Sequence, residues 1–221
     1  MRNSFVIYKE TLLKNYPDQI IHSSRSSILI NTILSFGKLI LGLISGSIWF
    51  DANAIYSLIL CIAKTQVLFK YNSLFIDPNN QNQYHLQQLH IFKKSGIFVL
   101  LTSISYFFVC LIMYIYKAHN AYPYYIVYGI TAIAFYKVFT AIKGLTISMK
   151  VKNPITTTLQ IFSFIDAMVS IVFVQCALIE MKNGINSAIL SSSLFGMVCS
   201  LVFMFIGLKM LFIPLIPFSE S

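Results

Sequence analysis

The sequence predicts an all-α integral membrane protein, a bundle of six transmembrane helices, on three observations. Of the 221 residues, 57% are hydrophobic and only 10% are charged, whereas soluble domains carry about 25% charged residues. The mean hydropathy is +0.75. The apolar residues fall in long runs, and a helix needs about 20 such residues to cross a bilayer. The chain has room for six runs of this length and for no sizeable soluble domain.

Short polar segments mark the limits of the spans. We expect a cytoplasmic N-terminal segment at 1–27, a transmembrane domain at 28–213 and a short tail at 214–221. Within the transmembrane domain the predicted spans are Ile28–Ile48, Trp49–Phe69, Gly96–Tyr116, Tyr124–Leu145, Ile155–Ile179 and Ile185–Leu211.

Lysine and arginine are distributed unevenly between the two predicted sides. With the N-terminus in the cytoplasm, thirteen of the 16 lie in inside segments or inner span ends, Lys117 and Lys182 lie outside, and Lys38 is left in mid-span. Cytoplasmic loops carry such an excess. We therefore expect a multi-pass protein of the cell membrane with both termini cytoplasmic. Lys64 and Lys137 lie inside their spans, where long side chains are expected to reach the inner interface.

The net charge of +9 has a simple explanation in a chain of this hydropathy. Basic residues that flank spans meet anionic lipid at the cytoplasmic face. We expect the lipid bilayer as partner and no nucleic acid. The sequence has no Gly-rich phosphate loop, nucleophile elbow or HExxH motif, so neither an enzyme nor a cofactor is expected. The four cysteines lie in apolar spans without CxxC spacing and are expected to be packing residues.

Polar residues follow one face of the first predicted span. Asn31, Ser35, Lys38, Gly42 and Ser45 are separated by 4, 3, 4 and 3 positions, which is the spacing of one helical stripe. A lysine near the bilayer midplane is costly in free energy. The stripe should therefore face protein or water rather than lipid.

The stretch 31–60 resembles the first two transmembrane helices of the cation diffusion facilitator family, whose members exchange zinc or other divalent cations for protons. The resemblance rests on Asn31, Lys38, Gly42, a Gly46-Ser47 hinge and the segment 52–58, Ala-Asn-Ala-Ile-Tyr-Ser-Leu. It extends to the six-span layout of most of the chain. It implies the family's bundle and cation/proton antiport.

The fifth predicted span carries the carboxylate expected near the midplane, Asp166. It lies about 12 residues, or about 18 Å, into a helix that enters from the cytoplasm, and Ser163 shares its face. An ionisable residue inside a membrane indicates a functional site. We expect its partner to be Lys38, at matching depth, within hydrogen-bonding reach or through one shared water. The alternatives are a purely structural pair and a carboxyl group that is simply protonated because it is withdrawn from water.

The fifth span also bears on metal binding. The segment 162–170 resembles the family's fifth helix, and the resemblance implies four metal ligands, of which Asp166 alone is kept. Tyr56, Leu60 and Phe162 occupy the other three positions, although zinc requires His, Cys or carboxylate ligands. The metal site is therefore expected to be degraded. His85 and His90 are weak candidates in the loop after the second span, and we expect them to be ordinary solvated residues.

Two functions fit this pattern. The first is a transporter of a cation or small solute, proton-coupled through Asp166, with Lys38, Asn53, Tyr56 and Ser163 along its substrate or proton pathway. The second is a non-transporting scaffold or accessory subunit that kept the fold. Small residues at helical spacing on the first and sixth spans allow close packing, either within the chain or in a homodimer.

Single-cysteine labelling tests the predicted topology. Membrane-impermeant thiol reagents should label positions 75–90 and 150–153 from the cytoplasmic side and positions 118–122 from the outside, because the Lys and Arg excess is retained in the cytoplasm. Labelling of positions 77–83 from the outside would reverse the orientation and overturn the assignment of the spans.

Overall fold

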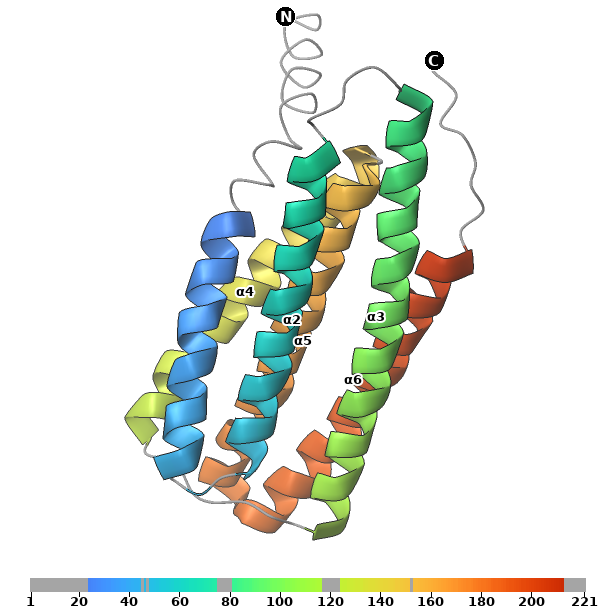
Figure 1. Cartoon of the computed structure of the whole chain (residues 1–221). Helices are drawn as coiled ribbons and strands as arrows, with labels where there is room; N and C mark the ends of the chain where they lie inside the picture. Colours follow the sequence, from blue (N-terminus) through green and yellow to red (C-terminus); the bar gives the residue numbers. More distant parts are fainter. Residues whose placement is uncertain are drawn as a thin grey trace, which may run out of the picture.

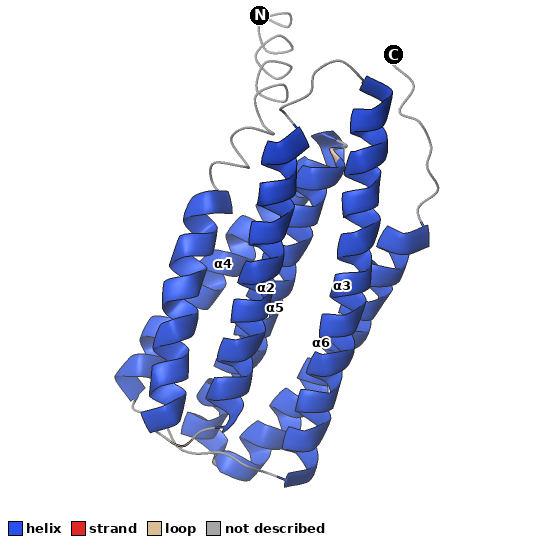
Figure 2. Ribbon diagram, viewed as in Figure 1, coloured by secondary structure: helices blue, strands red, loops and turns tan. Residues whose placement is uncertain are grey.

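The regular structure of the chain is helical throughout the part described (Figures 1 and 2). The computed structural model describes residues 24–44, 46, 48–74, 81–116, 124–151 and 153–212. Six of its helices are long and apolar enough to cross a membrane, as the sequence predicts. They are an N-terminal helix, Ser24–Ile44, followed by α2 (Ile48–Leu74), α3 (Gln81–Tyr116), α4 (Tyr124–Val151), α5 (Pro154–Asn183) and α6 (Ile185–Phe212).

The helices extend beyond the predicted spans at several ends. The largest difference is at α3, which begins at Gln81 rather than at Gly96. Hydropathy marks the apolar part of a helix, whereas a helix continues into polar sequence as long as nothing breaks it. The N-terminal helix begins at Ser24, before the predicted Ile28. Residues 1–23 and 213–221, which include the predicted tail, lie outside the described residues.

Helix α5 is the centre of the bundle. It contacts α2, α3, α4 and α6, and 67% of its most apolar stretch is buried, against 11% for α4 and 17% for the N-terminal helix. Helix α3 packs mainly along α6, and α2 contacts both α3 and α5. A residue on α5 can therefore meet side chains from several other helices at once.

Short polar connections fix the ends of the helices. Asn153 caps α5, because its side-chain oxygen accepts hydrogen bonds from the backbone N–H of Ile155 at 3.0 Å and of Thr156 at 3.2 Å. Gly184 separates α5 from α6 with φ of 83°, and Gly46 lies in the predicted hinge with φ of 65°. Glycine adopts such positive values of φ without steric cost.

Helices α3 and α6 approach each other closely at two glycines. A Cβ atom on Gly96 would lie 2.9 Å from Met210 Cβ, and one on Gly207 would lie 2.8 Å from Leu100 Cγ. Small residues permit this approach between membrane helices. The small residues predicted at helical spacing on the sixth span are Ser192, Gly196 and Ser200, and they also lie at helix contacts. Ser192 and Ser200 are buried, and Gly196 faces Cys110 of α3. This stripe packs within the chain.

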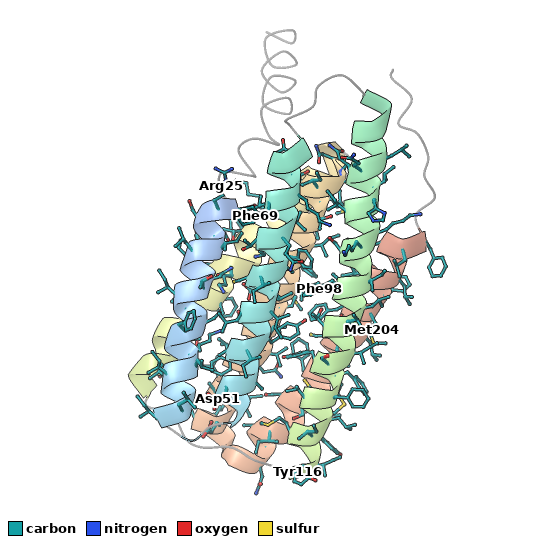
Figure 3. All side chains as sticks on the ribbon, viewed as in Figure 1. Arg25, Asp51, Phe69, Phe98, Tyr116 and Met204 are labelled. Atoms are coloured by element: carbon teal, nitrogen blue, oxygen red, sulfur yellow. The ribbon has the colours of Figure 1, made fainter. Side chains whose placement is uncertain are left out.

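Labelled side chains identify the two ends of the bundle (Figure 3). Arg25 lies at one end, and Asp51 and Tyr116 lie at the other. We refer to them as the Arg25 end and the Tyr116 end.

The glycine contact generates a stability prediction. Gly207→Val should lower the free energy of unfolding by about 1–3 kcal/mol, because the added methyl groups force α3 and α6 apart. Thermal unfolding of the purified protein in detergent measures the change. Gly129→Val is the matched control, since no heavy atom lies within 4 Å of a Cβ built there. Equal loss of stability in both variants would contradict a tight α3–α6 contact.

Candidate functional site

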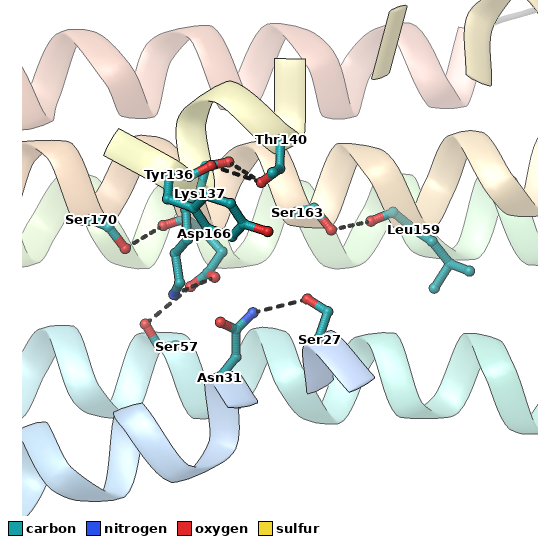
Figure 4. Close-up of polar contacts among 10 residues, drawn as sticks. All are labelled: Ser27, Asn31, Ser57, Tyr136, Lys137, Thr140, Leu159, Ser163, Asp166 and Ser170. Carbon is teal, nitrogen blue, oxygen red and sulfur yellow. Dashed lines mark hydrogen bonds and ion pairs between the residues drawn. The ribbon is translucent and has the colours of Figure 1, made fainter. Parts of the chain in front are cut away.

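Asp166 is a buried carboxylate held by two other helices. It lies on α5 and is 3% exposed. Lys137 of α4 places its Nζ atom 3.1 Å from Asp166 Oδ2, and the Ser57 hydroxyl of α2 donates a hydrogen bond to Oδ1 at 3.2 Å (Figure 4). A charge removed from water is destabilising unless it is paired and hydrogen-bonded. Both carboxylate oxygens meet this requirement, and the contact joins α2, α4 and α5 at one point.

Hydroxyl groups around the carboxylate are bonded to their own helices. Ser170 donates to the carbonyl oxygen of Asp166 at 2.8 Å, and Ser163 donates to that of Leu159 at 3.0 Å (Figure 4). Thr140 bonds in the same way one turn back along α4. Such bonds satisfy a hydroxyl without a partner helix.

Two further lysines lie near the pair without contacting it. Lys64 of α2 is 2% exposed and makes no hydrogen bond or ion pair with any residue that the structure describes. Lys38 lies with its Nζ atom 5.3 Å from the centroid of the Phe173 ring, a distance typical of a cation–π interaction. Asp166 is therefore surrounded by three lysines, of which Lys137 alone contacts it.

A polar cavity leads to the pair from the Arg25 end. It lies between the N-terminal helix, α2, α4 and α5 and has a volume of about 580 Å³, within the range of about 300–1,000 Å³ found for small-molecule sites. More than half of the residues that line it are polar or charged. These are Ser24, Ser26, Ser27, Asn31, Lys64, Lys137, Thr140, Lys143, Gln160, Ser163 and Asp166. We call this space the polar cavity.

A second, smaller cavity continues from it toward the Tyr116 end. It has a volume of about 300 Å³ and is lined mainly by apolar side chains. Lys38 also lines it. We call it the apolar cavity. The two cavities share Leu34, Ile133 and Lys137 in their walls. Because Lys137 lines both, its ion pair with the carboxylate stands at the junction between the two spaces.

The direct hydrogen bond predicted between Lys38 and Asp166 is wrong, whereas a link through one shared water stays a prediction. Lys38 lies over Phe173, and Lys137 takes the place expected for Lys38. The expectation that Lys137 extends to the membrane surface is wrong for the same reason: its side chain is 16% exposed and points to the carboxylate (Figure 4). Helix α4 packs directly against α5, so Lys137 reaches Asp166 without crossing another helix.

The other predicted site residues divide into two groups. Ser163 lines the polar cavity with Asp166. Asn53 and Tyr56 line neither of the two cavities. Asn53 is buried on α2, and Tyr56 packs against Tyr106 of α3 with ring centroids 4.9 Å apart. The predicted common chamber therefore forms around Asp166 and Ser163, with Lys38 in the adjoining apolar cavity.

Apolar packing fills the positions at which the family resemblance places metal ligands. Tyr56, Leu60 and Phe162 all belong to the buried hydrophobic core, and Phe162 packs edge-on against Phe98 with centroids 6.1 Å apart. Across the described ranges, no three His, Cys, Asp or Glu side chains converge on a point. The chemistry around Asp166 is that of ammonium groups and hydroxyls.

The two histidines lie on a helix rather than in a loop. His85 and His90 both fall within the first turns of α3, because this helix begins before the polar sequence ends. His90 is exposed. Residues 75–80, which include part of the segment 77–83 that the labelling experiment tests, lie outside the described residues.

Sequence reasoning missed Lys137, Lys64 and Gln160 as site residues, although a signal was present. Lys137, Ala141 and Gly144 are separated by 4 and 3 positions, so they form a small and polar stripe on α4. Ser57 and Lys64 lie two turns apart on one face of α2. A lysine on a stripe of small residues faces a neighbouring helix more readily than lipid.

The ion pair predicts a difference between two lysines of the same helix. Lys137→Met should lower the free energy of unfolding by about 3–5 kcal/mol, because it leaves a buried carboxylate without its cation. Lys137→Met combined with Asp166→Leu should recover part of this loss. Titration of the purified protein with denaturing detergent measures both. Lys143→Met, which removes an exposed lysine of α4, is the control, and an equal loss in that variant would contradict the pairing.

Comparison of the chain with known protein families and with curated proteins finds no match.

Proposed function

We propose that this chain is a membrane transporter of a small solute, and that the solute enters through the polar cavity between the N-terminal helix and α4. The observation that carries the proposal is the ion pair of Lys137 and Asp166 at the inner limit of a cavity of about 580 Å³. Ionisable residues inside membrane helices are rare and mark solute or proton pathways. A bundle that served only as a scaffold would gain nothing from a charged cavity.

The position of the ion pair suggests how access would alternate. The pair separates the polar cavity from the apolar cavity, and Lys137 belongs to the walls of both. Separation of Lys137 from Asp166 would join the two cavities, and its re-formation would close them. Secondary transporters move helices against each other around a site of this kind near the bilayer midplane. Proton coupling would act through Asp166.

The charge distribution supports an orientation for this path. We place both termini in the cytoplasm and the protein in the cell membrane, because Lys and Arg predominate on that side. The Arg25 end then faces the cytoplasm. In this orientation the polar cavity opens inward, and the apolar cavity lies deeper in the membrane.

The resemblance to cation diffusion facilitators favours the transporter proposal, but one observation favours the alternative. Tyr56, Leu60 and Phe162 pack in the core where the resemblance places metal ligands. A scaffold or accessory subunit that had lost metal transport would have this property. The charged cavity is the feature that such a subunit does not require, and it therefore supports the transporter proposal.

Flux measurements test the proposal. Proteoliposomes that contain a pH-sensitive dye are exposed in turn to divalent cations, monovalent cations, small amines and small organic acids. We expect at least one class to be transported, and we expect Asp166→Asn to reduce that flux by at least about tenfold because it removes the charge at the junction of the cavities. Asp51→Asn, at the Tyr116 end of α2, is the matched control.

A labelling experiment separates the two functions if no flux is found. In a variant whose native cysteines are replaced, Ser163→Cys should react with a water-soluble thiol reagent from the cytoplasmic face. An inert protein in every flux assay, together with an unreactive cysteine at position 163, would overturn the transporter proposal in favour of the scaffold.

A further inference from the structure

The polar cavity contains a buried cation that makes no hydrogen bond or ion pair with the residues that the structure describes. Lys64 is 2% exposed and lines the cavity, yet no side chain or backbone group in the described residues bonds to its ammonium group. An ammonium group that is withdrawn from water and left unpaired is destabilising. The cavity beside Lys64 is where a compensating group has room to bind.

The walls of the polar cavity carry an excess of positive charge. Three lysines line it, Lys64, Lys137 and Lys143, and a single carboxylate, Asp166. That carboxylate is already engaged, by Lys137 at 3.1 Å and by a serine hydroxyl at 3.2 Å. With all four groups ionised the balance is two positive charges. A divalent cation would increase this imbalance, whereas an anion would reduce it.

Neutral amide groups line the same cavity as Lys64. Gln160 lines the cavity, and its amide makes no hydrogen bond with the residues that the structure describes. Its side chain lies against Gly144 of α4, where any Cβ atom would collide with it. Asn31 on the opposite wall holds its amide 3.5 Å from the Ser27 hydroxyl. Ammonium and amide N–H groups are the donors that carboxylate and phosphate oxygens accept.

We propose that the polar cavity binds a small organic anion whose carboxylate or phosphate group is held by Lys64, with Gln160 as a second donor. The size of the cavity, about 580 Å³, exceeds the needs of a single chloride ion and fits a small organic solute. The inference deepens the proposed function and rests on it for the statement that the anion is transported. Binding of the anion is measurable apart from transport.

Thermal unfolding of the purified protein in neutral detergent tests the binding. Succinate and inorganic phosphate should each raise the unfolding temperature in a saturable way, by about 3 °C at concentrations far above the dissociation constant. Zinc and putrescine, as cationic probes, should not. Stabilisation by the cations and not by the anions would overturn the proposal, and this comparison needs no variant.

Variants then locate the site. Lys64→Met should weaken binding of the effective anion by at least about tenfold, and Lys64→Arg should restore most of it, because arginine keeps the charge. Lys209→Met is the matched control, since Lys209 lies on α6 over Phe205 and outside the cavity. Unchanged binding in a folded Lys64→Met variant would overturn the assignment to this site.

Two further measurements distinguish a lipid headgroup from a soluble anion as the ligand, and anion binding from transport. Stabilisation by phosphatidylglycerol in place of the soluble anions, lost in Lys64→Met, would support the same chemistry with a lipid headgroup as its source. Saturable binding of succinate or phosphate without flux would support the anion site and contradict transport. Flux of a cation without any anion binding would support transport and overturn the anion site.

Discussion

The structure depends on the pairing of one carboxylate inside an apolar bundle. Asp166 is withdrawn from water on the most buried helix, and an unpaired charge there would cost a large fraction of the free energy that stabilises a typical fold. Lys137 and Ser57 remove that cost. Because they come from α4 and α2, the pairing also determines how these two helices lie against α5.

The same requirement explains which parts of the site the sequence could predict. The importance of Asp166 follows from its residue type and its position in an apolar run, and the structure places it at the inner limit of a cavity. Its partner could not be derived, because three lysines, Lys38, Lys64 and Lys137, stand well inside the predicted spans, away from the span ends. Depth alone does not distinguish them. The choice of Lys137 depends on which helix packs against α5, and hydropathy does not give helix neighbours.

The fold was more accessible to sequence reasoning than the site. Long apolar runs predicted the number of membrane-spanning helices and about half of the helix ends to within one residue, since a helix must satisfy its own backbone hydrogen bonds in lipid. The start of α3 at Gln81 could not be predicted from apolar runs, because the first residues of this helix are polar. The close contact at Gly96 and Gly207 was missed for a related reason. Each glycine marks a contact only when its partner on the other helix is known.

The charge at Asp166 and the apolar packing at the positions where the resemblance implies metal ligands form one consistent pattern. Tyr56, Leu60 and Phe162 contribute to the core, so these positions carry apolar packing. Toward the N-terminal helix and α4, the space that remains is lined by more lysines than carboxylates. Electrostatic attraction selects the sign of a solute before shape selects its identity. A bundle of this architecture with this charge balance is therefore better suited to an anion than to the divalent cations that its sequence resemblance suggests.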